Sequence, residues 1–258
     1  MSYFTTEQIN ELQKKLNGAR SKADNILHNW TSLELRSERA KEFARHGVAR
    51  RVQILRRCLE IIFEQMPPAT QEAPSRHDLL DATISIQTFI MNVFGVLDNI
   101  AWTWIEESGL CKPDGAKLRP TEVGLTPRFE YIRNSLSNET QSLLNEYRDW
   151  FDYIIDLRHA LAHRIPLYVP PNCIDSEHVE EYQQLDQRKF EAILASRWDE
   201  LREILSRQNE LQHFKPFMRH SFSERAQTIV VHPQILSDLE CIDSISTAIL
   251  KDISNLTN

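Results

Sequence analysis

Glycine scarcity is the feature of this sequence that most limits its fold. Only 6 of the 258 residues are glycine, the residue that supplies the positive φ angles of tight hairpin turns and of loops that cradle phosphates. All-β folds and glycine-loop nucleotide sites are therefore disfavoured. The eleven prolines leave five proline-free stretches, over 1–66, 75–112, 128–165, 172–215 and 234–258. Long stretches without proline are typical of helices, so the sequence predicts an all-α fold.

Apolar residues at steps of three and four place helices inside these stretches. We expect one helical domain over 1–258, built as a bundle of about six to seven helices. The expected elements are long N-terminal helices within 5–66, a central helix at about 77–109, a helix at about 139–165, and C-terminal helices within 185–256.

Three of these regions carry finer signals. Thr5 and Gln8 have the spacing of a capping box at the start of the first helix. One further amphipathic helix is predicted from an apolar seam of five residues: Phe190, Leu194, Trp198, Leu201 and Leu205. Residues 166–184 and 213–232 are expected to be irregular, with a short strand at 228–231.

The sequence predicts neither a cofactor nor a membrane span. Its four cysteines stand far apart, without the C-x-x-C pairs of zinc or redox sites, which favours reduced thiols in a cytoplasmic protein. The N-terminal residues lack the basic and then apolar order of a signal peptide. The most apolar window, 84–105, contains Gln87, Asn92, Asp98 and Asn99, so we expect a core helix there and no contact with a membrane.

Two charged residues interrupt otherwise apolar helix faces. Arg158 lies on the seam that passes through Phe151, Ile154 and Leu161, and Asp98 lies on a seam of the central helix. A buried charge is costly unless an opposite charge, a phosphate or water satisfies it. We therefore predict that Asp98 and Arg158 pair across neighbouring antiparallel helices. A plain ion pair that fixes the helix register is the structural alternative.

A second stripe of the same predicted helix combines acids with histidines. It consists of five residues at steps of three and four: Asp149, Asp152, Asp156, His159 and His163. The helix is expected to end near His163, because Pro166 follows closely. Two histidines at i and i+4 can both bind one metal ion, with Asp152 or Asp156 adding carboxylate oxygens. A metal-binding helical bundle is therefore one alternative function, and a histidine that only interacts with the helix end is another explanation.

Residues 158–163 read Arg-His-Ala-Leu-Ala-His: an arginine, a polar residue, three more residues and a histidine. This spacing, at the C-terminal end of a long helix, resembles the R-x4-6-H motif of the HEPN superfamily, small all-helical domains found in many prokaryotic ribonuclease toxins and defence proteins. The resemblance covers about 76–165. It implies metal-independent cleavage of RNA at a composite site between two protomers, and therefore a homodimer without a cofactor.

By this resemblance the candidate catalytic residues are Arg158, His163, Asp98 and His159. His163 would exchange protons, since imidazole titrates near neutral pH. Arg158 would stabilise the phosphate oxygens, Asp98 would orient Arg158, and His159 would assist at the rim. Many members of the superfamily look like non-catalytic domains. The alternative function is therefore a helical interaction or RNA-binding module in which Arg158 serves only the structure.

The charges are unevenly distributed along a chain whose formal net charge is -7. Residues 36–57 hold eight bases against two acids, a pattern typical of local phosphate binding. The candidate nucleic-acid-binding residues in this segment are four arginines: Arg50, Arg51, Arg56 and Arg57. Alternatively, this basic face pairs with the acidic segment 175–210, which holds ten acids against five bases.

Overall fold

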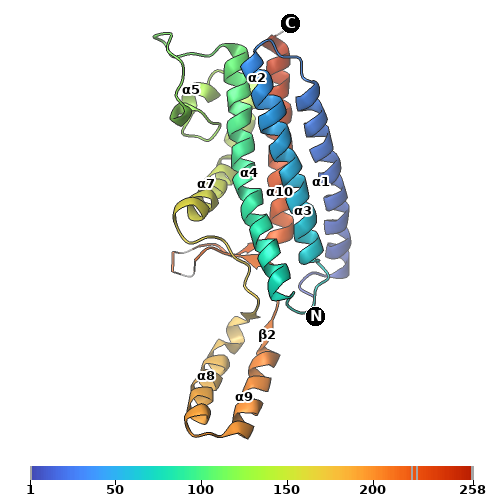
Figure 1. Cartoon of the computed structure of the whole chain (residues 1–258), viewed down its shortest axis with the longest axis vertical. Coiled ribbons are helices and arrows are strands. Elements are labelled where there is room, and N and C mark those ends of the chain that lie inside the picture. The colour runs from blue at the N-terminus through green and yellow to red at the C-terminus, as the bar shows by residue number, and fades with distance from the viewer. Residues whose placement is uncertain (1, 222, 225, 257–258) are drawn as a thin grey trace.

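The computed structural model describes residues 2–221, 223–224 and 226–256. It is an all-α protein, as predicted, and its long helices lie side by side in one main bundle (Figure 1). The long helices are α1 (Thr6–Ser32), α3 (Ala49–Gln65), α4 (Arg76–Ser108) and α10 (Val231–Leu256). The last of them, α10, packs against α1, α3 and α4, so both ends of the sequence contribute to one core.

The first helix begins where the capping box predicts. The Thr5 hydroxyl accepts a hydrogen bond from the Gln8 backbone N–H at 3.3 Å, and the Gln8 side chain accepts one from the Thr5 N–H at 2.9 Å. The buried stripe of α1 recurs every three or four residues: Leu12, Leu16, Ala19, Ala23, Ile26 and Trp30. At its end the Trp30 indole donates to the Ser246 hydroxyl of α10 at 2.6 Å.

A short helix and a π-helical segment precede α3. The chain runs from α2 (Glu38–Glu42) through η1 (Phe43–Val48) directly into α3. Gly47 in the π-helical segment allows α4 to approach closely, because a Cβ there would lie 2.3 Å from the side-chain oxygen of Asn99. The helices α3 and α4 are consequently in close contact, so side chains of α3 reach the surface of α4.

The central helix α4 has the bounds predicted for it to within one residue. The Ser75 hydroxyl caps its start by accepting the Asp78 N–H at 3.2 Å, and Gly109 ends it in the left-handed region at φ 70°. Among the described helices it alone is long and apolar enough to cross a membrane, yet 56% of its most apolar window is buried inside the protein. Burial of this extent is what a core helix requires.

The helix predicted at about 139–165 is in fact two helices. α6 (Asn138–Glu146) ends and α7 (Arg148–His163) begins at Tyr147, whose φ of -89° and ψ of 17° depart from helical values. Neither glycine nor proline marks this break. The physical reason is tertiary packing, since α6 packs against α10 whereas α7 packs against α4.

The amphipathic helix predicted from Phe190 to Leu205 is also wrong as a single element. Two helices, α8 (Val179–Leu194) and α9 (Trp198–Leu211), form an antiparallel hairpin that projects away from the main bundle (Figure 1). A three-residue turn joins them, with Ser196 in the left-handed region at φ 53°. The hairpin has a small apolar cluster of its own: Leu185, Ala192, Ile204 and Leu211.

The remaining elements are short. The connectors contain η2 (Pro120–Glu122), α5 (Glu130–Arg133) and η3 (Ser176–His178). Two antiparallel strand pairs flank the hairpin and α10: β1 (Cys173–Ile174) with β2 (Gln212–His213), and β3 (Phe217–Met218) with β4 (Ile229–Val230). Strand β4 confirms the strand predicted at 228–231.

Candidate functional site

The arginine–histidine motif lies where α7 packs against α4. The buried side of α7 is formed by Phe151, Ile154, Leu157 and Ala160. Arg158 is half-buried beside this row, and its guanidinium carbon lies 4.3 Å from the centroid of the Phe94 ring of α4. Such a cation–π contact stabilises by about 0.5–2 kcal/mol. It therefore fixes the guanidinium over the surface of α4.

Asp98, one helical turn after Phe94, has a perturbed carboxyl group. Burial raises the pKa of Asp98 from 3.8 to about 6, and the charges of Arg158 and Arg51 oppose this rise without cancelling it. Among the described residues no direct ion pair joins Asp98 to Arg158, whose guanidinium packs on the Phe94 ring. The Arg158 charge acts on Asp98 through space, and a closer pairing of the two groups stays a prediction.

Arg51 of α3 joins the same cluster. Its Nη1 donates to the Asn92 side-chain oxygen at 3.0 Å, while the Asn92 amide nitrogen donates to the Thr88 carbonyl at 2.8 Å. The guanidinium lies directly over Gly95, where a Cβ would be 2.4 Å from the Arg51 Cζ. Sequence reasoning named Arg51 but missed Asn92 and Gly95. A glycine inside a helix was the available signal, because such a residue often permits close packing.

Two guanidinium groups and one carboxyl group thus lie near each other on α3, α4 and α7. The cluster carries a net charge of +1 when Asp98 is ionised and +2 when it is protonated. A cationic cluster with a half-buried arginine is suited to binding an anion, and guanidinium groups bind phosphate oxygens in a two-pronged geometry. The cluster is therefore a candidate phosphate-binding group made of side chains alone.

The two histidines of the motif are exposed at the end of α7. The ring centroids of His159 and His163 are 6.4 Å apart, and the rings are inclined by 61°. Within the described residues neither ring has a hydrogen-bond or ion-pair partner. Both imidazoles are consequently open to solvent and to a substrate. We refer to Arg51, Asp98, Arg158, His159 and His163 together as the α4–α7 site.

The metal alternative finds little support in this geometry. No group of three or more His, Cys, Asp or Glu side chains able to hold a metal ion occurs in the described part of the chain. Asp156 of the predicted ligand set is instead occupied with other groups: its Oδ1 accepts from Arg164 at 2.5 Å, and its Oδ2 lies 3.5 Å from the His220 Nε2.

The acidic half of the predicted stripe lines a separate cavity of about 510 Å³, together with His220 and Glu224. Arg164 also reaches Glu224 there, at 3.3 Å. His159 and His163 do not line this cavity. Sequence reasoning missed Arg164 and His220, which lie far apart in the chain and carried no motif.

The basic segment is only partly available for a ligand. The Arg56 guanidinium pairs with Asp24 and Glu60, and that of Arg57 pairs with Glu60 and Glu64 at 3.1 and 3.4 Å. Arg50 lies 3.2 Å from the His46 ring. The acids that pair with Arg56 and Arg57 come from α1 and α3, so pairing with the acidic segment 175–210 is not observed among the described residues.

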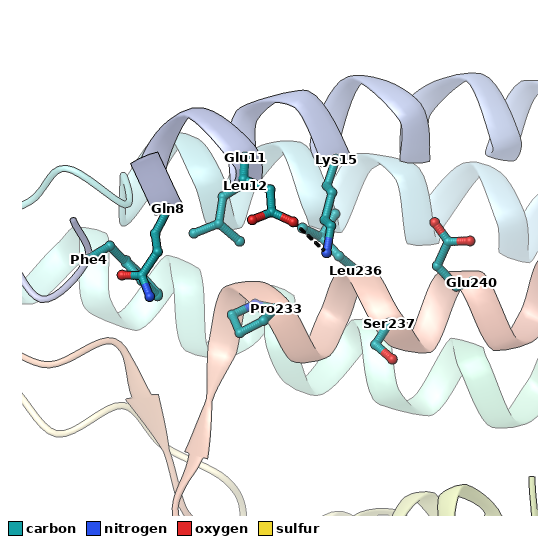
Figure 2. Close-up of a pocket in the computed structure, with 9 residues that line it drawn as sticks. All are labelled: Phe4, Gln8, Glu11, Leu12, Lys15, Pro233, Leu236, Ser237 and Glu240. Atoms are coloured by element: carbon teal, nitrogen blue, oxygen red, sulfur yellow. Dashed lines mark ion pairs between the residues drawn. The ribbon is translucent and has the colours of Figure 1, made fainter. Parts of the chain in front are cut away.

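A further cavity, of about 390 Å³, lies between the beginnings of α1 and α10 (Figure 2). Phe4, Leu12 and Leu236 supply apolar walls, and the Lys15–Glu11 ion pair of 3.2 Å lies at its edge. No residue of the α4–α7 site lines this cavity. Arg51, Asp98 and Arg158 lie elsewhere, at the contact of α4 with α3 and α7, and His159 and His163 are exposed at the end of α7.

Comparison with models of known protein families, with curated proteins and with solved structures gave no match. Function is therefore inferred from the geometry of the α4–α7 site.

Proposed function

We propose that this protein is a HEPN-like, metal-independent endoribonuclease acting at the α4–α7 site. The single observation that carries the proposal is that Arg158 and Arg51 lie beside Asp98, while His159 and His163 are exposed at the end of α7 with no hydrogen-bond or ion-pair partner among the described residues. A phosphate-binding cation and a free imidazole are the two requirements for cleaving RNA through its ribose 2′-hydroxyl.

Each residue has a defined part in this reaction. Arg158, assisted by Arg51, binds the non-bridging phosphate oxygens and stabilises the charge that develops on them. One imidazole accepts the proton of the 2′-hydroxyl as its oxygen attacks phosphorus, and another donates a proton to the departing 5′-oxygen. His163 takes the first of these parts. His159, or His163 of a second copy, takes the other.

An exposed apolar stripe on α4 supports a homodimer around this site. Leu80, Ile84 and Met91 are exposed although they lie on a core helix, and they step at helical spacing toward Phe94 and Asp98. An apolar row of this kind is expected to be covered by a partner. A second copy seated on it would bring two motifs together, as the resemblance implies.

The four free cysteines fit the reducing cytoplasm.

RNA cleavage in the presence of EDTA tests this proposal. The wild type should degrade total cellular RNA, and His163→Ala and Arg158→Ala should each reduce the rate at least about 100-fold. The matched control is His77→Ala, which removes an exposed histidine at the other end of α4. If the wild type and His163→Ala are equally inactive, the proposed ribonuclease function is rejected.

The Arg158–Phe94 contact favours a second candidate, a non-catalytic RNA-binding or interaction module in which Arg158 is structural. In that case Arg158→Ala lowers the unfolding temperature and His163→Ala changes neither RNA cleavage nor stability. Thermal unfolding of both variants, measured beside the cleavage assay, distinguishes the two functions.

A further inference from the structure

The projecting α8–α9 hairpin carries an apolar surface that has no partner among the described residues. Besides Val179 at the start of α8, five large apolar side chains are exposed on it: Phe190, Ile193, Leu194, Trp198 and Leu205. Leu194 is 72%, Phe190 64% and Trp198 57% exposed. We call these five residues the hairpin face. Figure 1 shows α8 and α9 beyond the end of the bundle, and their contacts are chiefly with each other.

Helix geometry places all five residues on one side of the hairpin. Each helix has a row of buried residues that faces the other helix. At about 100° per residue, each of the five exposed residues lies a quarter to a half turn around its helix from that row, and all are displaced in the same direction of rotation. In an antiparallel pair, residues displaced in the same direction of rotation on both helices lie on the same face of the pair. The interhelical ion pairs Arg207–Glu181 (2.7 Å) and Arg188–Glu200 (3.3 Å) are displaced in the opposite sense. The hairpin thus has one charged face and one apolar face.

The charges around the hairpin face indicate which kind of partner fits it. On this side Asp186 pairs with Lys189 and Arg202 pairs with Asp199, so the charges around the hairpin face are balanced within one copy. The two helices together hold eight acids and four bases, so an anionic lipid surface or RNA is repelled. An apolar face whose charges are balanced does not repel an identical face, so a second copy fits it.

The size of the face matches a self-associating surface. Its five side chains expose on the order of 500 Å² of apolar area, and the neutral residues between them add to this, against the ~800 Å² per partner of a standard interface. Two antiparallel helices with a single buried line are also half of a four-helix bundle. A second hairpin supplies the other half.

We propose that the hairpin face is a dimerisation surface on which the α8–α9 hairpin of a second copy packs to form a four-helix bundle. This inference does not depend on RNA cleavage. The contact lies outside the α4–α7 site and holds two copies together whether or not that site is active.

Sedimentation analysis of the full chain over a range of concentrations tests the proposal. The wild type should self-associate. Leu194→Glu should raise the dissociation constant by roughly 30-fold or more, because both copies lose a buried leucine and gain a charge. Phe190→Ser should have a smaller effect in the same direction. The matched control, Gln184→Glu, adds the same charge on the other side of α8 and should associate as the wild type does. Circular dichroism establishes that each variant keeps its helix content.

Hydrogen exchange at low and high protein concentration locates the contact. Amides of 185–205 in the wild type should become more protected as concentration rises, and those of Leu194→Glu should not. A wild type that stays monomeric, or that associates without protecting 185–205, overturns the proposal. So does a wild type that remains monomeric but sediments with neutral phosphatidylcholine vesicles, since that outcome identifies a membrane as the occupant.

Discussion

Replacing Asp98 by asparagine is expected to stabilise the protein at neutral pH. Burial raises the pKa of Asp98 from 3.8 to about 6, and the two nearby arginines do not form an ion pair strong enough to lower it. The folded protein therefore holds the Asp98 proton more tightly than the unfolded chain does. Stability from this proton is fully present below pH 3.8 and is lost as the pH rises to about 6.

The size of the effect follows from the shift. At roughly 1.4 kcal/mol per pKa unit, the change from 3.8 to about 6 corresponds to about 3 kcal/mol. Water at this partly accessible group reduces the value, so we expect Asp98→Asn to be about 1–3 kcal/mol more stable than the wild type at pH 7.5. At pH 4 the two proteins should differ little, because the protonated carboxyl group and the amide are similar in shape.

Urea unfolding at pH 4, 6 and 7.5, followed by circular dichroism, measures this difference. The gap between the variant and the wild type should open as the pH rises through 4–6 and then stay constant. A variant that is 3–5 kcal/mol less stable at pH 7.5 would contradict the reasoning, because a loss of that size is typical of breaking a direct buried ion pair.

Three further substitutions test the packing beside Asp98, the exposed side of α1 and a buried histidine of α10. Gly95→Ala should displace the Arg51 guanidinium, whose Cζ lies 2.4 Å from the new Cβ. It should weaken RNA binding several-fold with little change in the unfolding temperature. Gly18→Ala places a Cβ that meets nothing within 4 Å, so it should only stabilise the folded protein, by about 0.5–1 kcal/mol. Burial lowers the pKa of His232 from 6.5 to about 4, so the neutral ring stabilises the fold above pH 6.5 and this contribution, up to about 3 kcal/mol, is lost as the pH falls toward 4. Acid unfolding of His232→Gln should accordingly be shallower between pH 6.5 and 4, and a slope equal to that of the wild type would exclude His232 as the cause.

The helical class and the long helices followed from residues whose effect is local. Few glycines, widely spaced prolines and the Thr5–Gln8 capping box act through the backbone next to them, so they could be interpreted without a structure. The breaks at Tyr147 and Ser196 could not be predicted in this way. No glycine or proline marks them. Contacts of α6 with α10 and of α7 with α4 determine the direction of the chain at Tyr147, and the contact between α8 and α9 determines it at Ser196.

The α4–α7 site was predictable only in part for the same reason. A charge in an apolar seam identified Arg158 and Asp98, because burial of a charge has a cost that the pattern reveals. The Phe94 ring as the partner of Arg158, and the place of Arg51 over Gly95, depend on the register between helices. The same holds for the cavity of Arg164 and His220, whose residues come from segments about 60 positions apart.

The chemical ends of the RNA products test the central claim most directly. If an imidazole of the α4–α7 site removes the proton from the ribose 2′-hydroxyl, cleavage in EDTA leaves a 2′,3′-cyclic phosphate on one product and a 5′-hydroxyl on the other. Mass spectrometry of a short RNA incubated with the wild type should find both ends, and they should disappear with His163→Ala while persisting with His77→Ala. Products with 5′-phosphate ends, or the same products from His163→Ala, would contradict the account.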